Sequence, residues 1–269
     1  VSVDFEFPRA KMERSAASSP SWEASPDHKE EEFTRALTLA LFDYLRKSHS
    51  RGFVLSISGG ADSAAAACLV SLMVDRAIAA LGVEGFAEKI GMNAGPNARD
   101  WVRKLLCCAY QPTENSGEVT RSAATAVAEA LGATFYILDV QHIVDAYEKL
   151  ISDAVERPLT WEQDDITLQN IQARARGPSV WMLANMRGAL LLSTSNRSEA
   201  AVGYATMDGD TCGGLSPIAG IDKAFLRRWL LWLERKGPEG MQPIPALHAV
   251  NVQTPTAELR PKGSDQTDE

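Results

Sequence analysis

The stretch VLSISGGADSAAAACLV, residues 54–70, joins an apolar, strand-like run to an alanine-rich run that is typical of a helix. The loop between them carries two serines, two glycines and one carboxylate: Ser58, Gly59, Gly60, Asp62 and Ser63. Free backbone N–H groups and the helix dipole favour an anion at the start of a helix, and glycine lets the backbone approach that anion closely. Asp62 would repel a bare phosphate, but it suits a phosphate that Mg²⁺ bridges. The loop therefore predicts a phosphate site with a metal-binding carboxylate.

Three other interpretations of this loop compete with a phosphate-and-metal site. No Gly-Lys-Ser/Thr follows the glycines, so the loop is not a Walker A loop. It also lacks the G-x-S-x-G pattern of a nucleophile elbow. A simple helix cap needs only one residue such as Ser58 or Asp62, whereas this loop combines several polar residues with two glycines. The full set favours the phosphate site.

Composition and charge limit the class of protein. The chain has 269 residues, 45% hydrophobic and 23% charged, which is enough for one large domain. A formal net charge of −8 argues against a nucleic-acid partner. No uninterrupted apolar run approaches the ~18 residues of a membrane span, and the first residues lack the basic-then-apolar order of a signal peptide. We therefore expect a cytoplasmic protein without a nucleic-acid or membrane partner, and its four cysteines, which form no C-x-x-C motif, to be reduced.

Strand-like and helical segments alternate along the chain. Helical spacing is expected over 31–48, 118–132, 141–155 and 223–237, and from residues 63 and 168 onward; strands are expected over 53–57, 105–110, 133–140 and 188–195. This alternation predicts an α/β fold with a parallel twisted sheet and helices on both faces. Ligands of such sheets bind at the carboxyl ends of the strands. Gly177-Pro178 would kink or restart the helix that carries it.

The two ends of the chain differ from this pattern. Residues 1–7 alternate like a strand without a hairpin partner, and residues 14–30 are rich in Ser, Ala and Pro. We expect residues 1–30 to be the end of an upstream domain plus a linker. Residues 31–269 then form the main domain, which we expect to be truncated at its C-terminus because the last residues are polar and no closing helix follows.

Two stretches together resemble a known family. The order S-G-G-x-D-S resembles the loop of the ATP pyrophosphatase (PP-loop) families, which cleave ATP between the α and β phosphates to adenylate a substrate. The segment LLLSTSNRSEAAVGYATMDGDTCGGLSPIAGIDKAFLRRWL, residues 190–230, resembles the signature region of NAD synthetases, where T-x-N-x-S-E, G-Y, G-D and a later Lys recur in that order. QNIQARAR (169–176) and the segment from residue 254 to the end resemble further parts of that family. The resemblance spans residue 31 to the end and implies an adenine nucleotide alpha hydrolase-like fold.

The resemblance also implies roles for single residues. It places ATP on Ser58, Gly59, Gly60, Asp62, Ser63, Thr194, Lys223 and Thr256; Mg²⁺ on Asp62 and Glu199; and deamido-NAD on Asn170, Arg174 and Asp210. Asp62 and Lys223 would be the catalytic residues. YQPTENSG (110–117) corresponds to a second ATP-facing loop.

Physical arguments from the residues agree with several of these roles. Thr194 and Glu199 lie just beyond an expected strand, where ligands bind. Lys223 opens an expected helix, where the dipole disfavours a cation, so a lysine there suggests an anionic ligand. Asn170 and Arg174 are four residues apart and share one helix face.

The reaction implied by the resemblance is an amidation. The carboxylate of deamido-NAD would attack ATP, and ammonia would convert the acyl-adenylate to NAD. The wording SNRSEAAVGYATMDGD resembles the glutamine-dependent branch, in which an upstream glutaminase domain supplies the ammonia, and the family suggests a homodimer or a larger homo-oligomer. Three alternatives stay open: an ammonia-dependent NAD synthetase, another PP-loop enzyme such as a tRNA-modifying one, and a non-catalytic nucleotide-binding module.

Overall fold

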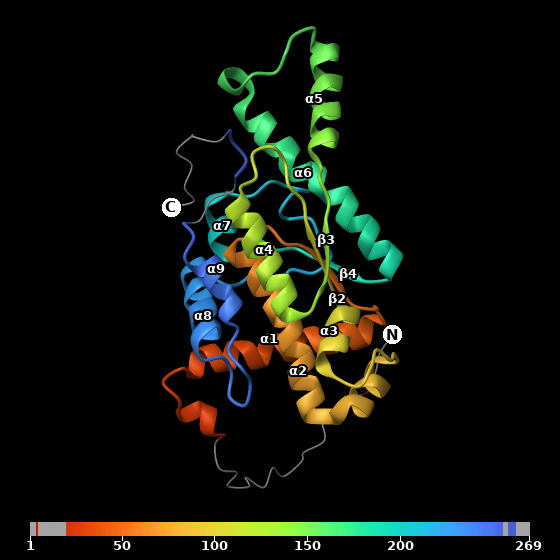
Figure 1. Ribbon diagram of the computed structural model, residues 1–269, viewed down its shortest axis with the longest axis vertical. Coiled ribbons are helices and arrows are strands. Elements are labelled where there is room, and N and C mark those ends of the chain that lie inside the picture. Colours follow the sequence, from red (N-terminus) through yellow and green to blue (C-terminus); the bar gives the residue numbers. More distant parts are fainter. Residues whose placement is uncertain (1–3, 5–19, 255–257, 262–269) are drawn as a thin grey trace.

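A four-stranded, fully parallel sheet lies at the centre of the protein (Figure 1). The computed structural model describes residue 4, residues 20–254 and residues 258–261, so residues 1–3 and Thr256 lie outside the described chain. The strands are β1 (Phe53–Ser56), β2 (Leu106–Tyr110), β3 (Thr134–Ile137) and β4 (Leu190–Leu192), in the spatial order β3-β2-β1-β4. The expected α/β fold with a parallel sheet is therefore confirmed.

Helices and short 3₁₀ turns connect and surround these strands. Their bounds are η1 (Ser21–Ala24), α1 (His28–Ser48), α2 (Ala61–Ile90), α3 (Ala98–Leu105), α4 (Glu118–Leu131), α5 (Gln141–Val155), α6 (Trp161–Arg187), α7 (Arg197–Val202), α8 (Lys223–Arg235), η2 (Pro245–Leu247) and α9 (His248–Asn251). The expected end of α4 at Gly132 is confirmed, because this glycine has the left-handed φ of +77° that ends a helix.

Successive residues of β1 point to opposite faces of the sheet and meet different helices. Phe53 and Leu55 belong to the larger core, which includes residues of α2, α4 and α8. Val54 instead packs with Val180 and Ala184 of α6. Helices therefore cover both faces, which explains why this strand is a continuous apolar run.

Helix α2 is apolar enough, by length and composition alone, to cross a membrane. In this fold its first half is a core helix, and the run from Ser63 to Val74 is buried throughout. Small alanines let the helix lie close to the sheet, and its apolar composition follows from that position. This composition is therefore weak evidence for a membrane span.

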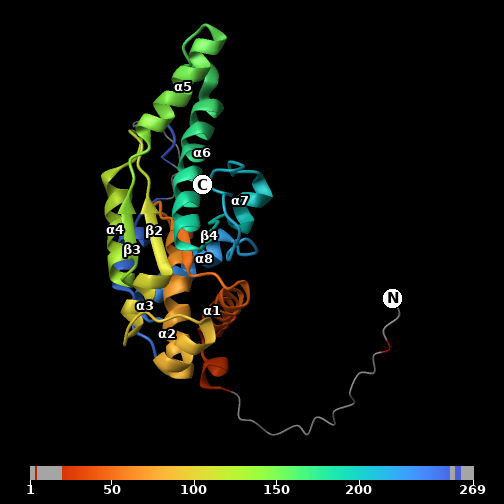
Figure 2. The same ribbon diagram turned by 90° about the vertical axis from the view of Figure 1, so that its right-hand side faces the viewer.

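The long helix α6 differs from expectation in two respects. It begins at Trp161 rather than near residue 168, and it continues through Gly177 and Pro178 without a break. The residue with non-helical dihedral angles inside α6 is Asp164, near its start. The helix therefore does not restart at Pro178 as expected, and Val180, close by on the same helix, packs against the sheet. With α5, the first turns of α6 form a hairpin that projects from the body of the protein (Figures 1 and 2).

Part of the segment that we expected to be a linker, residues 14–30, is helical among the described residues. Residues 21–24 form η1, and α1 begins three residues before the expected position of 31. Glu30 pairs with Arg228 of α8, with 2.8 Å between Oε1 and Nε. The strand-like residues 1–3 and 5–7 lie outside the described chain, and the domain boundary near residue 30 stays a prediction.

Candidate active site

A cavity of about 810 Å³ opens at the carboxyl ends of the strands. Residues that follow β1, β2 and β4 line it, together with α6, α9 and residues 258–260. Among the predicted site residues, the following line this cavity: Ser58, Gly60, Asp62, Ser63, Asn170, Thr194, Glu199, Asp210 and Lys223. The fold thus brings segments that are far apart in the sequence to one edge of the sheet, as parallel topology predicts.

The loop before α2 is arranged for an anion. The N-cap of α2 is Gly60, and no side chain caps it. Ser58 and Ser63 instead bond each other, with 3.1 Å between their hydroxyl oxygens, and Ser58 Oγ accepts the N–H of Gly60. The first turn of α2 is therefore not capped by a side chain, which argues against a simple cap and favours an anion there.

Close packing explains why the first glycine of the loop, Gly59, is a glycine. It has a φ of +86°, and a Cβ at this position would lie 2.2 Å from the carbonyl oxygen of Thr120 in α4. Only glycine fits this close approach and this left-handed conformation. Gly59 does not line the cavity itself, but it lets the starts of α2 and α4 lie side by side.

Two carboxylates and one ammonium group form the charged centre of the cavity. Lys223 Nζ lies 3.2 Å from Glu199 Oε1 and 3.7 Å from Asp62 Oδ2. Asn196 donates from Nδ2 to Asp62 Oδ1 over 2.9 Å. These groups come from the first turn of α2 after β1, from the N-cap and first turn of α7 after β4, and from the first residue of α8.

Burial shapes the charge of this centre. It raises the pKa of Asp62, which the Lys223 ammonium and the Asn196 hydrogen bond oppose. Burial also raises the pKa of Glu199, and the nearby Asp62 charge adds to this effect. Two carboxylates that share a partly buried place are stabilised by positive charge, and they are therefore suited to a cation.

The two carboxylates fit Mg²⁺. Asp62 Oδ2 and Glu199 Oε1 both face the same cation, the Lys223 ammonium. Mg²⁺ in nucleotide sites binds one or two carboxylates and completes its shell with phosphate oxygens and water. In the described part of the chain no group of three or more His, Cys, Asp or Glu side chains could hold a metal. Asp62 and Glu199 would thus hold the ion together with a phosphate ligand.

The residues predicted to bind deamido-NAD meet around one loop. Asn170 Oδ1 accepts the hydroxyl of Thr206 over 2.8 Å, and Asp210 Oδ1 accepts the Thr206 N–H over 2.9 Å. Arg174 donates from Nε to the carbonyl of Met207, but it is exposed and is not part of the cavity lining. Asn170 and Asp210 are thus placed for a ligand, and Arg174 supports the loop beside them.

Arg176 is the arginine of α6 that lines the cavity. Its Nε donates to the carbonyl of Gln111 over 3.0 Å, and burial lowers its pKa. The sequence interpretation gave Arg174 this position. The signal that could have found Arg176 is the small or apolar series Ala173, Gly177 and Val180, which marks the inward face of the helix.

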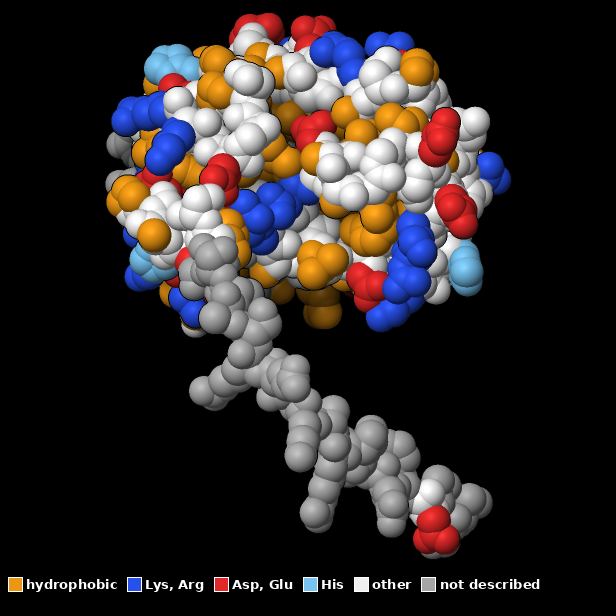
Figure 3. All heavy atoms as spheres, turned by 90° about the horizontal axis from the view of Figure 1, so that it is seen from below, with side chains coloured by type: hydrophobic (Ala, Val, Ile, Leu, Met, Phe, Trp, Pro, Cys, Tyr) orange, Lys and Arg blue, Asp and Glu red, His pale blue; other side chains and the backbone are white. Residues whose placement is uncertain are grey.

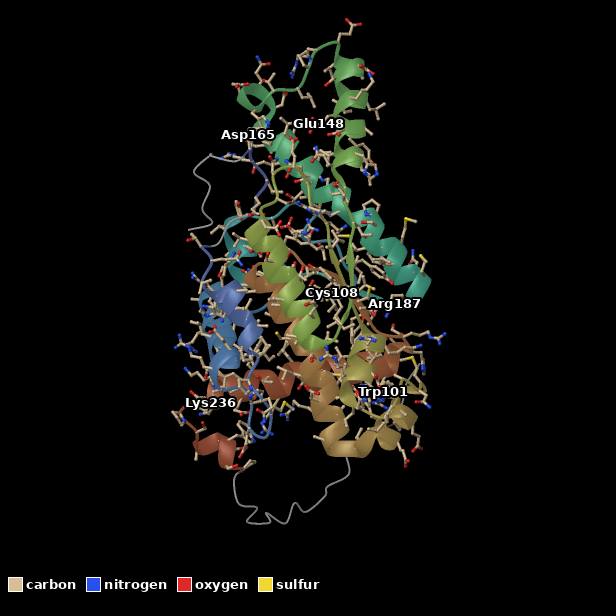
Figure 4. The ribbon with its side chains drawn as sticks, in the orientation of Figure 1. Trp101, Cys108, Glu148, Asp165, Arg187 and Lys236 are labelled. Atoms are coloured by element: carbon tan, nitrogen blue, oxygen red, sulfur yellow. The ribbon has the colours of Figure 1, made fainter. Side chains whose placement is uncertain are left out.

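The loop after β2 and residues 258–261 close one side of the cavity. Tyr110, Gln111 and Ser116 line it, as the expected second ATP-facing loop should. Glu258 Oε2 accepts the Gly117 N–H over 2.9 Å at the start of α4. Arg260 pairs with Asp165 in the first turns of α6, which Figure 4 labels, with 2.6 Å between Nη2 and Oδ2. Sequence interpretation missed Glu258 and Arg260, while Thr256 lies outside the described residues.

The parallel sheet, the uncapped loop before α2 and the charged centre define the class of protein: an α/β nucleotide-binding protein of the PP-loop type. Residues 33–269 match the family model described as NAD synthase. The chain belongs to this family.

Two similar proteins are glutamine-dependent NAD(+) synthetases. That of Aquifex aeolicus is 34% identical over 237 residues, which cover 88% of this chain and 35% of the relative. The crystal structure of that of Cytophaga hutchinsonii is 48% identical, with a TM-score of 0.78, covering 87% of this chain and 40% of its own. The chain thus spans about 35% of the length of the curated relative from Aquifex aeolicus. An NMN synthetase from Francisella tularensis shares the fold at 23% identity, with a TM-score of 0.64, covering 89% of this chain and 79% of its own.

Proposed function

We propose that this chain is the ATP-dependent domain of a glutamine-dependent NAD synthetase. It would amidate deamido-NAD to NAD and convert ATP to AMP and pyrophosphate. One observation carries this proposal. Ser58 and residues 60–63, which include the uncapped start of α2, line the same cavity as the charged centre formed by Asp62, Glu199 and Lys223. A plain nucleotide-binding module needs an anion site, but it does not need two carboxylates and a lysine beside it.

The reaction has two steps. A carboxylate oxygen of deamido-NAD attacks the α-phosphorus of ATP, and the bond from this phosphorus to the bridging oxygen of pyrophosphate breaks. The N–H groups at the start of α2 hold the departing pyrophosphate, and Lys223 stabilises its developing negative charge. Ammonia then attacks the acyl carbon, AMP leaves, and the nitrogen loses a proton.

Positioning is the main contribution of the protein to this chemistry. The reaction requires no nucleophilic side chain, because the substrate carboxylate and ammonia are the nucleophiles. When bound between Asp62 and Glu199, Mg²⁺ would neutralise phosphate charge and orient the oxygens of ATP. In this proposal Asn170, Arg176 and Asp210, which line the cavity, contact the acceptor.

Glutamine as the nitrogen source is supported by the names of the relatives. In our proposal a separate glutaminase domain of the same protein releases the ammonia. The same proposal includes a cytoplasmic location, in line with the acidic, reduced-cysteine composition.

A homodimer is part of this proposal. Large apolar side chains are exposed on α5 and α6, among them Leu150 (62% exposed), Ile166 (72%), Met182 (64%) and Met186 (81%). Exposed apolar side chains of this size are common at protein–protein interfaces. These exposed methionines favour packing in a dimer over packing in the core of one chain.

The test is pyrophosphate release by the natural full-length protein, with ATP, Mg²⁺ and ammonium chloride, with and without deamido-NAD. We expect release that depends on deamido-NAD and is matched by NAD formation. Nicotinic acid mononucleotide serves as the comparison acceptor, because one protein of the same fold is an NMN synthetase.

Three outcomes decide between the alternatives. Faster pyrophosphate release with nicotinic acid mononucleotide would show that this mononucleotide, and not deamido-NAD, is the acceptor. The same assay is repeated with glutamine in place of ammonium chloride. NAD formation with ammonium but not with glutamine would contradict the glutamine-dependent branch. Pyrophosphate release that ignores both acceptors would contradict the synthetase function altogether.

A further inference from the structure

Asn196 lies between the two carboxylates of the charged centre. Its side chain is fully buried, with 0% of its surface exposed. Nδ2 donates to Asp62 Oδ1 over 2.9 Å, and Oδ1 accepts the backbone N–H of Glu199 over 3.0 Å. The backbone N–H of Asn196 in turn faces Glu199 Oε2 at 3.4 Å. One residue therefore contacts both carboxylate residues.

Helix capping accounts for two of these three contacts, which together form a capping box at the start of α7. A capping asparagine needs its oxygen to accept a backbone N–H of the first turn, and Asn196 Oδ1 does this at the start of α7. Asn97 caps α3 in the same way, but its Nδ2 donates to Asp100 within its own helix. At Asn196 the Nδ2 group instead crosses to Asp62, which is 134 residues away in the sequence. Capping does not require that second bond.

Sheet topology brings the two loops together without fixing their side chains. β1 and β4 are hydrogen-bonded neighbours, so the residues that follow them lie at the same edge of the sheet. Asp62 follows β1, and Glu199 follows β4. The Asn196–Asp62 hydrogen bond links the start of α7 directly to the start of α2, and so joins the helices that carry two groups that otherwise repel each other.

The bonds of Asn196 also select which oxygens remain for a cation. They engage Asp62 Oδ1 and Glu199 Oε2. The other oxygen of each group, Asp62 Oδ2 and Glu199 Oε1, faces the Lys223 ammonium. Asn196 thus makes no hydrogen bond to the two carboxylate oxygens that face the Lys223 ammonium, Asp62 Oδ2 and Glu199 Oε1.

We infer that Asn196 is a positioning residue that holds Asp62 and Glu199 at the separation required to bind one divalent cation beside a nucleotide phosphate. The inference rests on the proposed function for the presence of that cation. Residues that orient metal ligands by hydrogen bonds change metal affinity by roughly 10- to 100-fold when they are replaced.

The experiment compares N196S with N97S in the full-length protein. Serine keeps an oxygen that can cap a helix but cannot donate to Asp62 across the same gap. Binding of Mn²⁺, a spectroscopic substitute for Mg²⁺, is followed by electron paramagnetic resonance in the presence of an ATP analogue with a non-cleavable α–β bond. We expect N196S to weaken Mn²⁺ binding at least about 10-fold, and N97S to leave it unchanged.

Enzyme kinetics and stability give two further measurements. In N196S the Mg²⁺ concentration for half-maximal activity should rise by the same factor as the Mn²⁺ dissociation constant. The thermal unfolding midpoint should fall in N196S and change little in N97S, since Asn196 is buried and loses its hydrogen bond to Asp62, whereas Asn97 is exposed and its serine keeps a capping oxygen. If N196S does not fold, N196T provides a second variant with the same capping oxygen and the same missing donor.

The opposite results would overturn the inference. Unchanged Mn²⁺ affinity in N196S, with lower thermal stability, would make Asn196 a helix cap and nothing more. If the wild-type protein forms NAD but binds no Mn²⁺ in the presence of the ATP analogue, the inferred cation site is wrong and the proposed function stands. If Mn²⁺ binding depends on Asn196 but the protein forms no NAD, the inference stands and the proposed function is wrong.

Discussion

The charged centre of the cavity and the α5–α6 hairpin place carboxylates in opposite situations. Burial raises the pKa of Asp62 in the centre. In the hairpin, the Arg157 hydrogen bonds and the Thr160 N–H lower the pKa of Asp164 to about 2. The hairpin balances the charge of Asp164 within its own residues, whereas the centre holds two carboxylates against one lysine. The centre is therefore suited to a further cation, and the hairpin is not.

The two regions also differ in how they treat apolar surface. Around the first half of α2 the apolar residues are buried on all sides. On α5 and α6 several are exposed, and the hairpin stands away from the rest of the protein (Figure 2). The end of the molecule seen in Figure 3 instead mixes charges of both signs with smaller apolar groups. The core around the first half of α2 is thus closely packed, whereas α5 and α6 expose large apolar side chains.

Lys223→Met tests the charged centre most severely. We expect kcat for NAD formation to fall roughly 10²- to 10³-fold, because the charge on the departing pyrophosphate loses its cation. The pKa of Asp62 and Glu199, which Lys223 lowers, should rise, so the acidic limb of the pH–rate profile should move to higher pH. Lys236→Met is the control, since Lys236 lies just past the end of α8, pairs with Asp27 and is not part of the cavity lining (Figure 4). Equal activity of both variants would contradict the role of Lys223.

Gly59→Ala tests the packing beneath the centre. The new Cβ would lie 2.2 Å from the Thr120 carbonyl oxygen at a φ of +86°. We expect the free energy of unfolding to fall by about 3 kcal/mol, the sum of left-handed strain and overpacking. Gly91→Ala has a similar φ of +67° but no neighbour within 4 Å, so it should cost only about 1 kcal/mol. Urea denaturation measures both, and equal losses would show that the close approach is unimportant.

Leu150→Glu tests the exposed apolar surface of the hairpin. Leu150 is 62% exposed, so a charge there should leave the fold intact but weaken the proposed dimer. Sedimentation analysis should show a shift from dimer toward monomer. Leu39→Glu on α1, at 66% exposed, is the matched control and should leave the assembly unchanged. A dimer that survives Leu150→Glu and dissociates with Leu39→Glu would move the interface to α1.

Arg157→Ala tests the charge balance within the hairpin. The pKa of Asp164, about 2 in the folded protein, should rise toward its ordinary value of 3.8. Because the folded pKa lies below the unfolded one, this pair stabilises the fold above pH 3.8 and loses that contribution as the pH falls through 2. NMR titration of the carboxyl carbon measures the shift. An unchanged pKa would assign the effect to the Thr160 N–H instead.

Local patterns predicted most of the fold and the loop before α2. β1, α2, α4 and α8 were all expected within a few residues of their observed starts. Pro178 misled the interpretation, because proline is a strong local signal against a helix and only packing against the sheet shows that α6 continues.

The site was predictable where its residues follow the strand ends directly. Asp62, Thr194 and Glu199 line the cavity as expected. Arg174 was expected there and Arg176 was not, because helical spacing gives the relative positions of side chains but not which face turns inward.

The sheet with its alternating helices, the glycine-containing loop before α2 and the family of the protein can all be read from the amino-acid sequence, since each depends on short segments with their own patterns. Three contacts emerge only when the chain is folded: Asn196 reaches Asp62, Gly59 lies against Thr120, and Glu258 meets the start of α4. These contacts join loops that follow different elements. Their geometry is set by how the whole sheet and its helices pack, and no local pattern in the sequence specifies it.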